Sequence, residues 1–179
     1  MMFKSTILTL PGIGGSGPQH WQSLWENEYG FIRIEQQDWD TPVRADWVAN
    51  IQNAVSKYDP QDVILVGHSA VCGAIIDWAQ QYQTKIKGAL LVAPADADAG
   101  TFPLGTKGFF PIPLIKLPFP SIVVTSTNDY FVAIDRAKQF ADAWGSEFIN
   151  IGDAGHINIA SGYGQWDKGL EILKRLDKP

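Results

Sequence analysis

Six short apolar runs are spaced along the chain, and each has the length of a β-strand. They occupy residues 6–10, 31–35, 63–66, 88–92, 122–125 and 148–151. Most of these runs are continuous rather than alternating, which is typical of strands that are covered on both faces. We therefore expect buried strands of one largely parallel sheet.

Between these runs, apolar residues recur at three- and four-residue spacing, the period of an amphipathic helix. One such pattern begins at Trp21, and the others cover residues 43–55, 71–82, 134–144 and 166–176. Strands that alternate with helices predict an α/β fold, a three-layer sandwich with a mostly parallel six-stranded sheet and helices on both faces. We see no linker and no internal repeat in the 179 residues, so we expect a single domain over residues 1–179.

Residues 95–120 interrupt this alternation, because they are rich in Pro, Gly and Phe and have no helical period. Long loops in compact domains are usually functional or mobile. Two interpretations are equally supported by the sequence: a surface excursion that covers the sheet edge, or a wall of a substrate pocket.

A glycine-rich turn follows the first predicted strand in "STILTLPGIGGSGPQHW". Gly12, Gly14 and Gly17 have the spacing G-x-G-x-x-G of a dinucleotide-binding loop, and Glu35 ends the next strand, where a ribose-binding acid belongs. A dinucleotide-binding oxidoreductase is therefore one hypothesis.

Composition narrows the classes of partner. The formal net charge is -5 and the Lys and Arg residues are scattered, which argues against nucleic acid. No apolar run approaches a membrane span, so we expect no membrane partner. The N-terminal "MMFKSTILTL" is strand-like rather than a signal peptide, and Cys72 is the only cysteine, which excludes an intramolecular disulfide and a multi-cysteine metal site. We expect a cytoplasmic protein.

The stretch "VILVGHSAVCGAI" contains the most informative motif. A strand ends, Gly67-His68-Ser69 follows, and a helix begins at once, as a nucleophile elbow requires. The usual pattern is G-x-S-x-G, and here Val71 replaces the second glycine, which we expect to crowd the helix against the strand and open the turn slightly. The alternative interpretation of Ser69 is a helix N-cap, a position that favours serine.

A serine nucleophile needs a base and a carboxylate that orients the base. In hydrolases built on a parallel sheet, the order along the chain is Ser, then Asp or Glu, then His, each after a strand. Asp129 follows the fifth predicted strand and His156 follows the sixth. The sequence therefore predicts Ser69, Asp129 and His156 as the catalytic residues.

Other polar residues offer alternatives or accompany this set. Asp96 and Asp98 follow the fourth predicted strand, where some such hydrolases place the acid, while Asp153 more plausibly shapes its turn. We expect Cys72 to be a small buried side chain. His68 is expected to point away from the nucleophile and to be structural.

Acyl transfer also needs backbone N–H donors for the developing oxyanion. One donor is expected from Ala70, directly after the nucleophile, and the other from Ile13 in the glycine-rich turn. Glycines let the backbone approach a substrate closely, so the same turn can serve a carbonyl oxyanion instead of a pyrophosphate.

With these motifs in place, the chain resembles the small serine hydrolases of the α/β-hydrolase superfamily that include the retinoblastoma-binding protein 9 family. The resemblance covers nearly the whole chain and rests on "PGIGGSGPQHW", "VGHSAV", "STND" and "DAGH". It implies a trimmed α/β-hydrolase fold without a large lid, and Ser69, Asp129 and His156 as the triad. It also implies that His20 and Trp21 lie near the substrate pocket.

The sequence therefore predicts a serine hydrolase that cleaves an ester or a similar small acyl substrate through an acyl-enzyme, with no cofactor and no metal. A non-catalytic protein-interaction module on a hydrolase fold is the alternative, although no protein partner is indicated by the sequence. The dinucleotide-binding oxidoreductase is less favoured, because it does not explain why three catalytic residue types follow three strands in the right order.

Overall fold

A computed structural model describes residues 3–178, and within them six strands form one sheet in which every pairing is parallel. The spatial order is β2-β1-β3-β4-β5-β6. The strands are β1 (Thr6–Leu10), β2 (Ile32–Arg33), β3 (Val63–His68), β4 (Gly88–Val92), β5 (Ser121–Thr125) and β6 (Glu147–Asn150).

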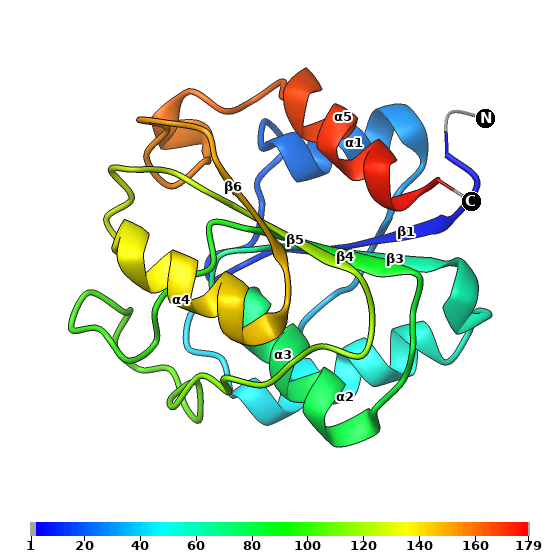
Figure 1. The fold of residues 1–179 in the computed structure, drawn as a ribbon, viewed down its shortest axis with the longest axis horizontal. Coiled ribbons are helices and arrows are strands. Elements are labelled where there is room, and N and C mark those ends of the chain that lie inside the picture. Colours follow the sequence, from blue (N-terminus) through cyan, green and yellow to red (C-terminus); the bar gives the residue numbers. More distant parts are fainter. Residues whose placement is uncertain (1–2, 179) are drawn as a thin grey trace.

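Helices cover both faces of this sheet, as Figure 1 shows: α1 and α5 lie on one face, and α2, α3 and α4 lie on the other. This arrangement confirms the predicted three-layer α/β class. The α-helices are α1 (Trp21–Tyr29), α2 (Arg44–Val55), α3 (Val71–Tyr82), α4 (Ile134–Trp144) and α5 (Asp167–Leu176). Two 3-10 helices are η1 (Pro60–Asp62) and η2 (Ile159–Ser161). None of the helices within residues 3–178 combines the length and apolar character needed to cross a membrane.

The apolar run of β3 shows why the sheet is covered on both sides. Successive side chains of a strand point to opposite faces. Val63 and Leu65 belong to the core cluster of α2, α3 and α4, whereas Ile64 and Val66 belong to the cluster of α1 and α5. Both faces of the strand are therefore apolar, and continuous hydrophobicity replaces alternation.

The predicted bounds hold best for central elements. β1, β4, α3 and α4 have the predicted residues, while only Ile32 and Arg33 of the predicted strand 31–35 form β2. β2 is an edge strand, so one neighbour alone stabilises it, and Ile34 N–H makes a last bond to Thr9 O (2.9 Å) before the chain leaves the sheet.

Residues 95–120 contain no helix or strand, and the interpretation as a pocket wall applies to part of this segment. Phe102 and Pro103 line a cavity at the edge of the sheet. Further along, Phe109, Ile112 and Leu117 are buried against the layer of α2, α3 and α4. The surface part therefore covers helices, and the expectation that it covers the sheet edge was wrong, because its buried apolar side chains pack on the helices.

Candidate active site

Ser69 lies in a sharp turn between β3 and α3. Its φ of 67° is in the left-handed region, which is a strained conformation for a residue other than glycine. Hydrogen bonds on either side maintain the turn, because Ser69 N–H donates to Val92 O (2.9 Å) and Cys72 N–H donates to Ser69 O (3.1 Å). The predicted nucleophile elbow is present in the structure.

Gly67 and Val71 explain how α3 approaches the strand. A Cβ on Gly67 would lie 2.6 Å from Ile75 Cδ1 and 3.3 Å from Val71 Cγ1, so the glycine makes room for both side chains. Val71 is buried in the core and does not line the cavity beside Ser69. Its effect is therefore on the packing of α3 rather than on the shape of the cavity.

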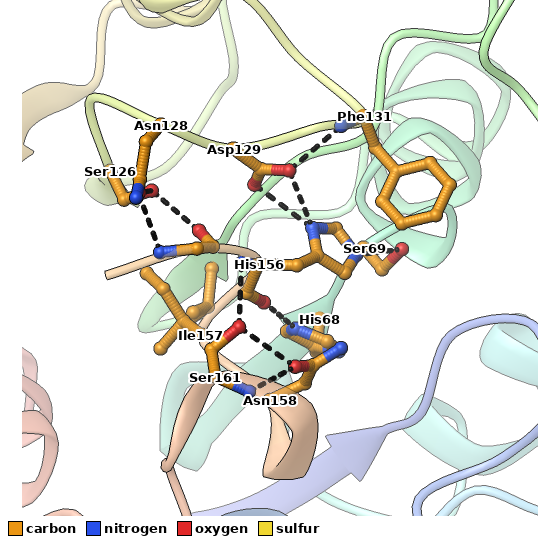
Figure 2. A network of polar contacts seen from close by, with 12 residues as sticks. His68, Ser69, Ser126, Asn128, Asp129, Phe131, His156, Ile157, Asn158 and Ser161 are labelled. Atoms are coloured by element: carbon orange, nitrogen blue, oxygen red, sulfur yellow. Dashed lines mark hydrogen bonds and ion pairs between the residues drawn. The ribbon is translucent and has the colours of Figure 1, made fainter. Parts of the chain in front are cut away.

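His156 lies between Ser69 and Asp129 (Figure 2). Its Nε2 is 2.8 Å from Ser69 Oγ, and its Nδ1 is 3.0 Å and 2.9 Å from the two carboxylate oxygens of Asp129. Because the carboxylate accepts the Nδ1 proton, Nε2 accepts the hydrogen bond from the serine hydroxyl. The Asp129 side chain is fully buried, and Phe131 N–H donates to its Oδ1 (2.9 Å). The arrangement has the connectivity that deprotonates a serine hydroxyl.

The loop that carries His156 is held by polar residues that the sequence analysis missed. Asn128 Oδ1 accepts a hydrogen bond from Gly155 N–H (2.7 Å), and Ser161 Oγ accepts one from His156 N–H (3.1 Å), as Figure 2 shows. Asn128 and Ser161 are separated by 33 positions, so only the folded chain brings them together around the histidine. The "STND" motif, which contains Asn128, was the only sequence signal for this residue.

His68 also supports this loop, since its Nε2–H donates to His156 O (2.9 Å). The two rings are 4.9 Å apart, and His68 lines the cavity. The expectation that His68 points away from the site was wrong. Strand alternation places it on the α1 and α5 side with Ile64 and Val66, and the His156 loop crosses that side.

The glycine-rich turn lies directly against Ser69. A Cβ on Gly12 would lie 2.7 Å from His68 O and 2.8 Å from Ser69 Cβ, so only glycine fits there. Ile13 and Ala70 both line the cavity beside Ser69, and neither backbone N–H donates to any residue in 3–178. Glu35 is exposed and lies outside this cavity. The geometry therefore favours an oxyanion over a dinucleotide.

The cavity has a volume of about 420 Å³, within the usual range for small-molecule sites. Among the described residues, none of those that line it is Asp, Glu, Lys or Arg. Its polar lining includes His20 and Asn158. Trp21 does not reach the cavity: it is fully buried and its indole N–H donates to Ile157 O (2.9 Å), because it faces the core beneath the His156 loop. The apolar walls are Ile13, Ala95, Phe102, Pro103, Phe131 and Ile159.

The other two histidines that line the cavity, His20 and His68, are uncharged at neutral pH. His20 Nδ1 accepts a hydrogen bond from Gln22 N–H (3.2 Å), so its proton is on Nε2. Burial, reinforced by the positive charge of Arg33 and by the neighbouring imidazole of His156, lowers the pKa of His20 to about 4. Burial also holds the pKa of His68 well below its usual value.

The remaining candidates lie away from the reacting atoms. Asp96 and Asp98 both form ion pairs with Arg136, and Asp153 is exposed. Cys72 is fully buried, and burial raises the pKa of its thiol. Within residues 3–178, no three His, Cys, Asp or Glu side chains are grouped as ligands for a metal ion.

A parallel sheet covered by helices, with a serine in a strained turn after a central strand, defines the class of α/β-hydrolase folds. The chain belongs to the serine hydrolase family, whose model matches residues 7–175. It is therefore a hydrolase of this family. No curated protein sequence matches it significantly.

Solved structures support the same class. A YdeN-like hydrolase from Pectobacterium atrosepticum is 35% identical, with a TM-score of 0.84 over 96% of this chain and 90% of that chain. The ydeN gene product of B. subtilis is 15% identical, with a TM-score of 0.81 over 97% and 98% of the two chains. An esterase from Thermogutta terrifontis is 20% identical, with a TM-score of 0.66 over 97% and 82%. Because the last two structures have low sequence identity to this chain, they support the assignment of the fold alone.

Proposed function

We propose that Ser69, His156 and Asp129 are the catalytic triad of an enzyme that hydrolyses small, uncharged acyl esters. The observation that carries this proposal is the continuous chain of hydrogen bonds from Ser69 Oγ through both ring nitrogens of His156 to the buried carboxylate of Asp129. Adjacent apolar walls provide a site for the acyl group.

The reaction follows from this geometry. Ser69 Oγ transfers its proton to His156 Nε2 and attacks the carbonyl carbon, and Asp129 stabilises the resulting imidazolium. The N–H groups of Ile13 and Ala70 stabilise the tetrahedral oxyanion. His156 then donates the proton to the leaving group. A water molecule repeats these steps on the acyl-enzyme and releases the acid.

The substrate class is inferred from the lining of the cavity. An ionised group on the substrate would meet no opposite charge among the described lining residues, so an uncharged ester is favoured. The fold neighbour from Thermogutta terrifontis is described as an esterase with butyrate bound, which is compatible with a short apolar acyl group. The dinucleotide hypothesis is disfavoured by the exposed position of Glu35.

We further infer that the chain is one domain, that it is related within the superfamily to the retinoblastoma-binding protein 9 family, and that it acts in the cytoplasm. The single six-stranded sheet supports the inference of one domain. The four sequence motifs support the relation to the retinoblastoma-binding protein 9 family. The single, buried cysteine supports a reducing compartment. Six tryptophans are buried and Trp39 is partly buried, so no exposed tryptophan supports the interaction-module alternative.

A fluorophosphonate probe tests the proposed function. We expect one adduct, located at Ser69 by peptide mass spectrometry, and loss of both labelling and ester hydrolysis in Ser69→Ala. Ser56→Ala is the matched control, because Ser56 is exposed at the end of α2 and does not line the cavity. Folded wild-type protein that does not react with the probe would refute the proposal.

A further inference from the structure

Gln22 is a fully buried polar side chain beside the site, and the reaction steps above do not use it. It lies in the first turn of α1. Its Nε2 donates to Leu10 O (3.0 Å) and to Val66 O (3.1 Å), and its Oε1 accepts from Ser16 Oγ (2.6 Å). Both amide protons and the amide oxygen therefore have partners.

The three hydrogen-bond partners of the Gln22 amide lie in the segments that lead into the site. Leu10 ends β1 and precedes the glycine-rich turn, and Ser16 is near the other end of that turn. Val66 precedes Gly67 in β3, the strand that leads to Ser69. One amide thus joins both ends of the turn that carries Ile13 to the strand that carries the nucleophile.

The two strands separate directly beyond this amide. Leu10 is paired with Gly67 in the last register position of β1 and β3. Two residues further on, Gly12 approaches so closely that an added Cβ would lie 2.8 Å from Ser69 Cβ. The spacing of the turn and the nucleophile is therefore tight, and Gln22 bridges the strands just before it.

A second set of contacts restrains the outer end of the turn. Ser16 O accepts hydrogen bonds from Ser23 Oγ (2.9 Å) and from Arg33 Nη1 (3.1 Å). The Arg33 guanidinium is in turn paired with Glu26 (2.8 Å). Because α1 supplies Gln22, Ser23 and Glu26, this helix acts as the support of the turn.

We propose that Gln22 is a positioning residue for the oxyanion hole: its amide sets the distance between the Ile13 N–H and the Ser69–Ala70 turn. This inference rests on the proposed function, which assigns the oxyanion donors. Gln22 does not line the cavity and touches no reacting atom. An apolar side chain at this position would leave two buried carbonyls and one buried hydroxyl without their amide partner, and the turn would shift to satisfy them.

The tests use Gln22→Met, which keeps the length of the side chain and removes the amide. Gln36→Met is the matched control, since Gln36 is also buried and its Oε1 accepts one hydrogen bond from Asn50 Nδ2 (2.8 Å) outside the cavity. The measurements are kcat and KM for an ester, the inhibition constant of an alkyl boronic acid, and the concentration of active sites titrated with fluorophosphonate. The boronic acid forms a tetrahedral adduct on the serine and so reports the oxyanion hole directly.

We expect Gln22→Met to lower kcat per titrated site about 10- to 100-fold, because a misplacement of about 1 Å in a catalytic group costs up to about 100-fold. KM should change by less than about threefold, since the oxyanion forms only in the transition state. Boronic acid affinity should fall by the same factor as kcat. Gln36→Met should have the kcat and boronic acid affinity of the wild type.

Ser16→Ala is a milder second variant, which removes one of the three hydrogen bonds, and we expect kcat to fall about 3- to 10-fold. A merely structural role would lower the melting temperature or the titrated fraction and leave kcat per site unchanged. An unchanged kcat per site in Gln22→Met overturns the inference. If Gln22→Met does not fold, the same result in Ser16→Ala overturns it. Failure of the proposed function is distinct, because the wild type itself would then neither label nor hydrolyse esters.

Discussion

At the scale of single residues, the three histidines of the chain gather in one place but in different environments. His156 faces the carboxylate of Asp129, whereas His20 and His68 are buried and their ring nitrogens hydrogen-bond to backbone groups. Only one of the three rings is therefore paired with a fixed negative charge. This difference supports the proposed role of His156 as the base.

Asp129→Asn tests that pairing. The amide is isosteric, but it does not stabilise the imidazolium and favours the wrong histidine tautomer, so we expect kcat to fall by about 10⁴-fold with little change in KM. Steady-state hydrolysis of an ester measures the effect. Asp153→Asn is the matched control, because Asp153 is exposed near the same loop, and its kcat should equal that of the wild type. Equal losses in both variants would contradict the assignment of the acid.

His20 makes the stability of the fold depend on pH. Its folded-state pKa of about 4 is below the ordinary value of 6.5, so the unfolded chain binds the proton more readily. Its contribution to stability is complete above pH 6.5 and is lost as the pH falls from 6.5 towards 4, by at most about 1.4 kcal/mol per pH unit.

His20→Asn keeps a side-chain acceptor for the cap of α1 and removes this titration. Urea unfolding at several pH values should give a shallower loss of stability below pH 6.5 in the variant than in the wild type. His68 is present in both proteins, and the main cause of its lowered pKa is burial, which the variant keeps. Parallel curves for the two proteins would refute the attribution.

At the scale of elements, the unit of β3 and α3 depends on one close approach. An added Cβ on Gly67 would overlap Ile75 Cδ1 at 2.6 Å. We expect Gly67→Ala to lower the free energy of unfolding by about 1–3 kcal/mol. Ile75→Val lacks that Cδ1 atom and alone costs about 0.5–1.5 kcal/mol.

The double variant Gly67→Ala/Ile75→Val should lose less stability than the sum of the two single variants, since the valine removes the overlap. Chemical denaturation of the four proteins completes the double-mutant cycle. Simple additivity would show that the overlap is relieved elsewhere.

The same elements show what sequence patterns predict and what they miss. The runs of β1 and β4 and the stripes of α3 and α4 gave the right bounds, because burial on one or both faces dictates their apolar residues. β2 was overestimated because Phe31 and Ile34 are buried outside strand pairing, and apolar side chains alone do not reveal hydrogen bonds.

For the site, the order of motifs placed Ser69, Asp129 and His156 near one another, because parallel strands end at one edge of the sheet. The direction of His68 and the role of Gln22 depend on contacts with residues up to 88 positions away. Neither His68 in β3 nor Gln22 in α1 has a local sequence signature of such partners. The pocket assignment of Trp21 failed for the same reason, since only the folded His156 loop shows that it is covered.

At the scale of the whole molecule, Ser69, Asp129, His156 and the glycine-rich turn come from four loops at one edge of the sheet, and a hydrophobic core lies on either side of the sheet. Segment 95–120 adds an outer wall through Phe102 and Pro103, while Leu104 next to them is 94% exposed. Within three residues, this segment therefore passes from the lining of the cavity to open solvent.

The burial of Cys72 has a practical consequence at this scale. A thiol reagent reaches the side chain only when the core beneath the nucleophile opens, so we expect native protein to react with Ellman's reagent orders of magnitude more slowly than protein in guanidinium. Comparable rates in the two conditions would contradict this protection.

Slow reaction would make the wild type a silent background for site-specific labelling. A fluorophore attached to Leu104→Cys would be the only label, beside two residues that contact the substrate in the proposed site. The enzyme would then be an optical sensor, with an emission that reports occupancy of its own cavity in real time.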